Sequence, residues 1–112
     1  MAGVHLGGRE QVALDDFVQR VRAALGPTLV ELRLFGSRAR GDAGADSDID
    51  VLVVVADDRV RAEDLAIDIA FDVNLAHDVY ISPRVLTADS LHDPLWRTTL
   101  FVRTLEREGV PL

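Results

Sequence analysis

Two aspartates, Asp48 and Asp50, are the residues of this sequence best suited to chemistry. They stand two positions apart at the start of an apolar, β-branched run with the sequence VLVVV. Side chains two apart on a strand point to the same face, so the two carboxylates are expected side by side, with Ile49 turned into apolar packing. Paired carboxylates at the end of a buried strand need a positive partner. A divalent metal ion that carries a triphosphate would provide one.

A Gly-Ser turn upstream of the aspartates provides residues suited to phosphate. Gly36 lets the backbone come close to a ligand, and the amides that open the following short helix can take phosphate. Ser37 is expected to donate to a terminal phosphate oxygen, to cap the helix, or both. Arg38 and Arg40 point to different faces of a helical turn, so at most one of these guanidinium forks should reach phosphate. Ser47 either supports the loop before the aspartates or is a turn residue.

This pattern resembles the signature of the minimal nucleotidyltransferases of the DNA polymerase β superfamily, of the MntA-like antitoxin type. The signature is a hydrophobic residue, Gly-Gly or Gly-Ser, about ten residues, and then Asp-hydrophobic-Asp/Glu-hydrophobic. In this chain it reads Phe35-Gly36-Ser37, residues 38–47, and Asp48-Ile49-Asp50-Val51. The longer strings GSRARGD and SDIDVLV match as well, and the resemblance extends through the ending REGVPL.

The resemblance implies a magnesium-dependent transfer of a nucleoside monophosphate, AMP from ATP, onto a hydroxyl with release of pyrophosphate. It implies that Asp48 and Asp50 hold two magnesium ions, which bridge the phosphates of the bound nucleotide and neutralise charge as the α-phosphoryl group is attacked.

The family chemistry also needs a third carboxylate on a neighbouring strand, flanked by hydrophobic residues. Asp78, in the sequence HDVYI, is the best candidate, and it would complete the second metal site and help to deprotonate the acceptor. His77 departs from the aliphatic flank of the family pattern. The structural alternatives for Asp78 are a strand edge or the cap of the preceding helix. Asp68 and Asp72 are the fallback, and they fit better as the polar face of a helix.

The resemblance also implies a partner. Many small members of the family are antitoxins of two-gene toxin–antitoxin pairs, and they adenylylate a tyrosine of an all-helical HEPN ribonuclease. A homo- or hetero-oligomer is compatible with this role. Two alternatives stay open: a catalytically inactive chain that neutralises a partner by contact, and a small-molecule transferase of the aminoglycoside type. The latter enzymes usually carry a further helical domain for the acceptor.

Composition excludes several other classes of function. The 112 residues carry 19 acidic residues against 12 arginines, for a net charge of −7, which argues against direct, charge-driven binding of nucleic acid. The chain has no lysine and no cysteine. Lysine-adenylate and Schiff-base chemistry, a P-loop, disulfides and zinc–cysteine sites are therefore excluded.

Targeting signals are not visible in the sequence. No apolar run follows a basic start, and none approaches the ~20 residues of a membrane helix. We expect a cytoplasmic protein without membrane contact, in which residues 1–8 form a flexible N-terminus and residues 9–112 a single nucleotidyltransferase domain.

The elements that must position the site can be predicted from hydrophobic periodicity. We expect, in order, a helix at Glu10–Leu25 stopped by Gly26-Pro27, strands at Thr28–Phe35 and Asp48–Val55, a helix at Arg61–Ala76 capped by Asp57 or Asp58, a strand at His77–Ser82, a helical turn at Ala88–Leu91, and a helix at Pro94–Glu108 capped by Asp93. Strands that alternate with helices predict a small α/β (α+β) domain, a mixed sheet with flanking helices. The resemblance implies the polymerase β-like nucleotidyltransferase fold.

Two of these elements carry a prediction about packing. In the first strand the expected core face is formed by Val30, Leu32 and Leu34. In the second long helix the expected apolar stripe is formed by Leu65, Ile69, Val73 and Ala76.

Overall fold

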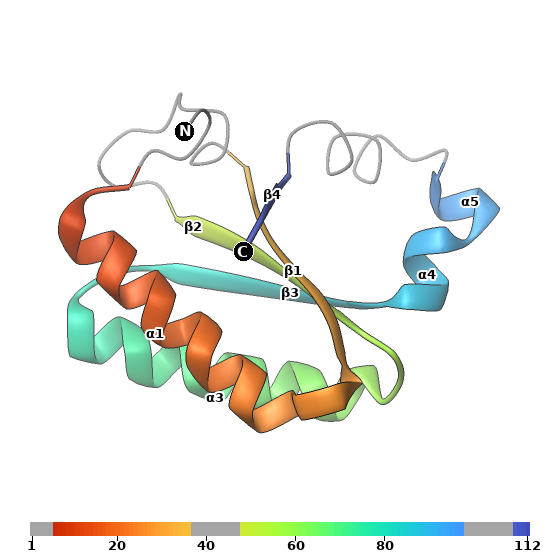
Figure 1. Cartoon of the computed structure of the whole chain (residues 1–112), viewed down its shortest axis with the longest axis horizontal. Coiled ribbons are helices and arrows are strands. Elements are labelled where there is room, and N and C mark those ends of the chain that lie inside the picture. The colour runs from red at the N-terminus through yellow and green to blue at the C-terminus, as the bar shows by residue number, and fades with distance from the viewer. Residues whose placement is uncertain (1–5, 37–47, 98–108) are drawn as a thin grey trace.

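The computed structural model describes residues 6–36, 48–97 and 109–112, and in this part of the chain four strands form one sheet with two long helices on one face (Figure 1). The elements are α1 (Gly8–Leu25), the short 3-10 helix η1 (Gly26–Thr28), β1 (Leu29–Phe35), β2 (Ile49–Val55), α3 (Arg59–His77), β3 (Ile81–Thr87), α4 (Ala88–His92), α5 (Pro94–Arg97) and β4 (Val110–Pro111).

The sheet is mixed, with the strand order β3-β2-β1-β4. β1 pairs antiparallel with β2 and with β4, whereas β2 and β3 run parallel. Parallel neighbours need a long crossover connection, and α3 provides it. The predicted mixed sheet with flanking helices is therefore confirmed, with one strand, β4, that the sequence did not predict.

The central strand β2 is buried on both faces, as its continuous β-branched run predicts. The side chains of one parity, from Ile49 to Val55, pack in the main core with α1 and α3. Leu52 and Val54 face the other way, into a smaller cluster with Leu86 and Leu91. Asp50 belongs to this second parity, so it lies on the sheet face opposite the two long helices.

The predicted ends of the helices are largely confirmed. α1 begins two residues before the predicted start, where Gly7 donates its amide to Glu10 Oε1 at 3.0 Å, and it ends at Gly26 as expected. Asp58 caps α3 by accepting from the amide of Arg61 at 3.3 Å. Asp93 accepts from the amide of Leu95 at 2.8 Å at the start of α5.

The predicted apolar stripe of α3 is confirmed in part, because Val73 is buried and Leu65 and Ile69 pack against the core. The buried residues are Ala62, Ala66, Ala70 and Val73. Leu65 and Ile69 are only partly buried, and Ala76 is exposed. The sequence prediction followed the larger side chains and missed that three of the four most buried positions of the helix are alanines. Alanines at this face let the helix backbone come close to its neighbours.

The predicted strand at His77–Ser82 is also wrong, because α3 continues through His77 and the strand starts later. Asp78 ends the helix in the left-handed conformation, with φ +54°. β3 then runs from Ile81 through Pro83 to Thr87. Proline is tolerated there because β3 is an edge strand.

Three further predictions concern Val30 at the start of β1 and the two helical segments that follow β3. A register shift between Leu29 and Glu31 turns Val30 outward, so its side chain is 54% exposed instead of joining Leu32 and Leu34 in the core. The predicted helical turn at Ala88–Leu91 is confirmed as α4. The last predicted helix is confirmed for α5, and residues 98–108 lie outside the described part of the chain.

None of the helices described in the chain is long and apolar enough to cross a bilayer.

Candidate active site

The end of β1 and the start of β2 bring Gly36 against Asp50. Phe35 is the register partner of Asp50, and Gly36 follows with φ +76°. A Cβ atom on Gly36 would lie 2.3 Å from Asp50 Oδ2, which is shorter than any normal contact. The carboxylate of Asp50 therefore occupies the space that a side chain at position 36 would fill.

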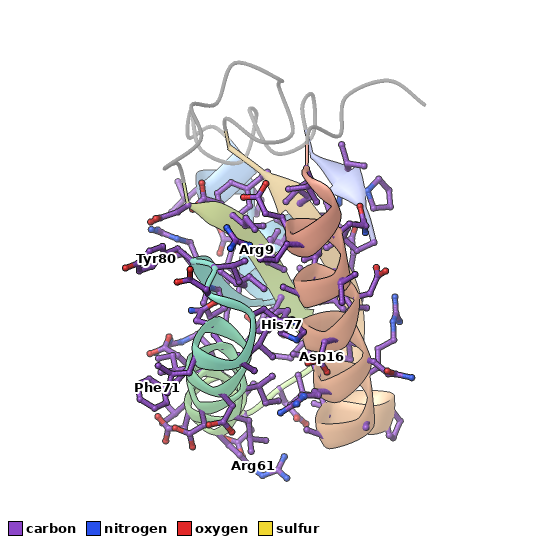
Figure 2. All side chains as sticks on the ribbon, turned by 90° about the vertical axis from the view of Figure 1, so that its left-hand side faces the viewer. Arg9, Asp16, Arg61, Phe71, His77 and Tyr80 are labelled. Atoms are coloured by element: carbon purple, nitrogen blue, oxygen red, sulfur yellow. The ribbon has the colours of Figure 1, made fainter. Side chains whose placement is uncertain are left out.

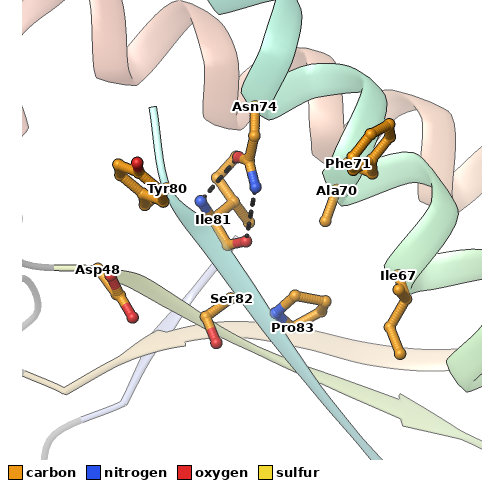
Figure 3. A pocket seen from close by; sticks show the side chains of 9 residues that line it. All are labelled: Asp48, Ile67, Ala70, Phe71, Asn74, Tyr80, Ile81, Ser82 and Pro83. Atoms are coloured by element: carbon orange, nitrogen blue, oxygen red, sulfur yellow. Dashed lines mark hydrogen bonds between the residues drawn. The ribbon is translucent and has the colours of Figure 1, made fainter. Parts of the chain in front are cut away.

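The two predicted aspartates flank the start of β2. Asp48 immediately precedes the strand and is exposed, whereas Asp50 is within it and half-buried. Figure 3 shows Asp48 and Ser82 pointing to the same side of the strands, away from Asn74 of α3. Ser82 of β3 is the register partner of Asp50. The sheet face opposite the long helices thus gathers two carboxylates and a hydroxyl from neighbouring strands.

Two arginines extend this face, and neither was predicted as part of the site. Arg33 of β1 and Arg84 of β3 are both register partners of Leu52, one on each side of β2. Leu52 has the same parity as Asp50, so both guanidinium groups belong to the face of the carboxylates. For Arg84 the available signal was the alternation of inward and outward positions from Ile81 to Val85, but the strand was predicted too early in the chain.

Four predicted phosphate-binding residues, Ser37, Arg38, Arg40 and Ser47, lie outside the described residues. Their roles stay predictions.

Asp78 is not on a strand, and its surroundings differ from the predicted ones. Its side chain is 92% exposed and forms an ion pair with Arg9 of α1, with 3.7 Å between Arg9 Nη1 and Asp78 Oδ2. Within residues 6–36, 48–97 and 109–112, no three His, Asp or Glu side chains are grouped so that they could hold a metal ion. The role of Asp78 as third carboxylate therefore stays a prediction. Asp68 and Asp72 are exposed on α3, as expected of its polar face.

The donors present fit a magnesium ion that arrives with a nucleotide. Mg²⁺ prefers oxygen ligands, keeps several waters, and is usually bound through one or two carboxylates together with substrate phosphates. Asp48 and Asp50 provide such carboxylates at the start of one strand. Arg84, on the neighbouring strand, provides a fork suited to phosphate oxygens.

A hydrogen bond between the two long helices lies on the other side of the sheet. His77 Nε2 of α3 and Asp16 Oδ2 of α1 are 3.0 Å apart, and the two side chains point toward one another in Figure 2. The His77 hydrogen bond, and after it the bond from Arg20, lower the pKa of Asp16 below its ordinary value. This role of His77 could not be predicted from the sequence, because a contact between two helices leaves no local signal.

Comparison with known proteins adds the family. Residues 14–110 match the family model described as "Nucleotidyltransferase domain". The inferred protein adenylyltransferases MJ1305 and MJ0141 of Methanocaldococcus jannaschii (strain ATCC 43067 / DSM 2661 / JAL-1 / JCM 10045 / NBRC 100440) are 34% and 35% identical over 73 and 71 residues. Each match covers 62% of this chain. The matched part spans 50% of MJ1305 and 72% of MJ0141.

Solved structures of a toxin–antitoxin system share the fold. The crystal structure of the toxin–antitoxin with AMP-PNP is 21% identical with a TM-score of 0.55, and the match covers 87% of this chain and 70% of that one. For the toxin–antitoxin MntA–HepT the identity is 20%, the TM-score 0.51, and the coverage 90% and 69%. The matched family model, together with this likeness in fold, gives one conclusion: the chain belongs to the nucleotidyltransferase domain family and has its polymerase β-like fold.

Proposed function

We propose that the chain is a magnesium-dependent protein adenylyltransferase that moves AMP from ATP onto a tyrosine hydroxyl of a HEPN-type toxin and thereby acts as its antitoxin. The observation that carries the proposal is the close contact between Gly36 and Asp50, which joins the two halves of the sequence motif at the start of β2. Two relatives are inferred protein adenylyltransferases, and structures with the same fold are toxin–antitoxin proteins, one with AMP-PNP.

The side chains on this face have distinct roles in the proposed reaction. Asp48 and Asp50 would hold Mg²⁺ together with the triphosphate, and the bound ion would neutralise charge at the phosphates. Arg84 binds phosphate oxygens. The tyrosine oxygen attacks the α-phosphorus, the bond to the bridging α–β oxygen breaks, and pyrophosphate leaves. Asp78 is proposed to accept the phenolic proton.

The test is a transfer assay on a purified HEPN partner with ATP and Mg²⁺. We expect the partner to gain the mass of one AMP unit on a tyrosine, and Asp50→Asn to abolish the gain. Asp15→Asn on α1 is the matched control, because Asp15 is exposed and, in the described part of the chain, its carboxylate hydrogen-bonds only to the side chain of Gln11. A partner that stays unmodified with the unsubstituted chain would refute the proposed transfer.

A second candidate function is neutralisation of the partner by contact. It is favoured by one observation: no third carboxylate joins Asp48 and Asp50 among the residues that the structure describes. Growth rescue separates the two candidates. If the double variant Asp48→Asn, Asp50→Asn still protects cells from the toxin as well as the unsubstituted chain does, protection is by contact. If protection is lost while the complex still forms, protection requires the transfer reaction.

A further inference from the structure

An exposed apolar stripe runs along α3 and continues past its end. Ile67, Phe71 and Leu75 are spaced by four residues, so they lie one above the other on the helix, and Tyr80 follows before β3. The exposed fractions of Phe71, Leu75 and Tyr80 are 62%, 70% and 71%. Figure 2 shows Phe71 and Tyr80 pointing to the same side of the molecule, away from α1. We call these four residues the α3 face.

The α3 face borders a groove that leads to the candidate active site. The groove has a volume of about 440 Å³, and Figure 3 shows its lining, with Asp48 and Ser82 at one side and Ile67 and Phe71 at the other. A second hollow of about 300 Å³ shares Phe71 and Tyr80 with it and reaches Leu75. The two hollows share lining residues and together extend from the end of α3 to Asp48, whose carboxylate points to the other side of the strands at this edge of the sheet.

The free edge of β3 cannot pair with a strand of a partner at the point where the groove begins. Ile49 donates its amide to the Tyr80 carbonyl at 2.7 Å, so Ile81 turns its own amide and carbonyl outward. The Asn74 side chain bonds both groups, at 2.8 and 3.1 Å. The next outward position is Pro83, which has no N–H. A partner that binds here thus uses side-chain contacts with the α3 face rather than strand addition.

The charge next to the α3 face indicates the chemistry of that partner. Asp64, Asp68 and Asp72 form a parallel row on α3, again four residues apart, and all three are exposed. Among the described residues, none of them has a hydrogen-bond or ion-pair partner through its carboxylate. The arginines of this helix, Arg59 and Arg61, are in its first turn. An apolar stripe with an acidic flank is complementary to apolar anchors flanked by lysine or arginine.

We propose that the α3 face docks a basic amphipathic helix of the protein acceptor and that the groove guides a hydroxyl of this acceptor to Asp48. This inference rests on the proposed function, because it identifies where the acceptor of that reaction binds. The apolar anchors of the acceptor contact Phe71 and Leu75, and its basic residues contact the acidic row. These two contacts together set the direction in which the bound helix runs along α3. Specificity then comes from α3, while the chemistry is carried out at β2.

The test uses a fluorescein-labelled amphipathic peptide of about four helical turns, with leucines and one tyrosine on one face and lysines beside them. A matched peptide carries glutamate in place of every lysine. Fluorescence anisotropy with the full chain measures binding. We expect the lysine peptide to bind at least about tenfold more tightly than the glutamate peptide. Equal binding of the two peptides, or no binding of either at about 1 mM, would overturn the proposal.

Substitutions on the surface locate the binding site. Phe71→Ser with Leu75→Ser should weaken binding of the lysine peptide by about tenfold or more, because both anchors are lost. Asp68→Lys with Asp72→Lys should weaken it as well and reverse the preference between the two peptides. Val12→Ser and Asp15→Lys are matched controls on α1, where both residues are exposed, and they should leave binding unchanged. Equal effects of controls and α3 variants would place the peptide elsewhere.

Two further readouts separate this inference from the proposed function. If the peptide binds through the α3 face but its tyrosine gains no AMP, docking holds and transfer to this acceptor fails. If the tyrosine gains AMP while the α3 variants bind and react normally, the transfer holds and the docking proposal fails. Light scattering tests whether a second copy of the chain binds to the α3 face instead. Self-association of the unsubstituted chain that is lost in the variant Phe71→Ser with Leu75→Ser would show that a second copy covers this face, and it would overturn the proposal.

Discussion

Gly36 and Asp50 are in such close contact that the carboxylate of one residue fills the side-chain position of the other. A Cβ on Gly36 would be 2.3 Å from Asp50 Oδ2 and 3.2 Å from its Cγ. The glycine of the motif thus has a role before any nucleotide arrives, because it leaves room for a carboxylate on the adjacent strand. The two parts of the motif act as one structural unit.

Substitution of Gly36 should damage both stability and nucleotide binding. Gly36→Ala combines a positive φ with a clash against Asp50, and we expect a loss of about 2–3 kcal/mol in the free energy of unfolding. Gly26→Ala is a matched control: its φ is +54°, but an added Cβ there meets nothing within 4 Å. It should cost about 1–2 kcal/mol, from the backbone conformation alone. Urea denaturation of both variants measures the difference, and equal losses would mean that the contact with Asp50 adds nothing.

Arg84 should contribute to binding of the triphosphate. Removing its charge with Arg84→Gln takes away a charge-assisted hydrogen bond, worth about 1.5 kcal/mol or roughly tenfold in Kd. Calorimetric titration with Mg²⁺ and a non-hydrolysable ATP analogue measures this affinity. Arg61→Gln, on the exposed side of α3, is the control and should leave the Kd unchanged. An Arg84→Gln variant with normal affinity would remove Arg84 from the phosphate site.

Asp78 can be tested separately from its ion pair. Asp78→Asn removes the carboxylate but keeps a residue that tolerates the left-handed conformation at the end of α3. Arg9→Gln breaks the same ion pair and leaves the carboxylate in place. If Asp78 is the third carboxylate, Asp78→Asn should lower the rate of AMP transfer by about 100-fold or more, and Arg9→Gln should not. Similar small effects of the two variants would limit Asp78 to the surface ion pair.

The contact between α1 and α3 should make stability depend on pH in acid. The pKa of Asp16 is lowered by the His77 hydrogen bond and then by Arg20, so the ionised carboxylate stabilises the folded chain. This stabilisation is fully present above the ordinary pKa of 3.8 and is lost as the pH falls through the lower pKa of the folded state. Asp16→Asn should therefore lower the free energy of unfolding by about 1 kcal/mol at neutral pH. The loss should become progressively smaller as the pH falls below 3.8.

Thermal unfolding of the variant and the unsubstituted chain between neutral and acid pH checks this dependence. Asp15→Asn, one residue away on the exposed side of α1, should show no such convergence. Two parallel stability curves for Asp16→Asn and the unsubstituted chain would contradict the prediction.

Local patterns in the sequence were sufficient for α1, β2 and the helix caps. The spacing of apolar residues sets the buried face of α1, and the β-branched run sets β2, because each signal lies within one element. The prediction from local patterns is wrong from His77 onward. Nothing in the local sequence distinguishes a helix that continues to His77 from a strand that begins there, and the left-handed turn at Asp78 decides between them.

Residues brought together only by strand pairing could not be predicted. Asp48 and Asp50 are close in sequence, and Gly36 is tied to them by a recognisable motif. The positions of Ser82 and Arg84 beside them depend on the register of β3 against β2, which is a tertiary property. β4, two residues long, was missed for the same reason, because it is a strand only through its pairing with β1.

From the parallel pairing of β2 with β3 we expect a fixed order in which this face is assembled. Gly36 and Asp50 meet once the antiparallel β1–β2 hairpin closes, a step between segments that are near in sequence. Arg84 arrives later, since the 19 residues of α3 must first cross the sheet before β3 can dock. We therefore expect Arg33 to join the carboxylates with the β1–β2 pairing and Arg84 to join them only when β3 docks, so that the complete phosphate-binding face is formed late in folding.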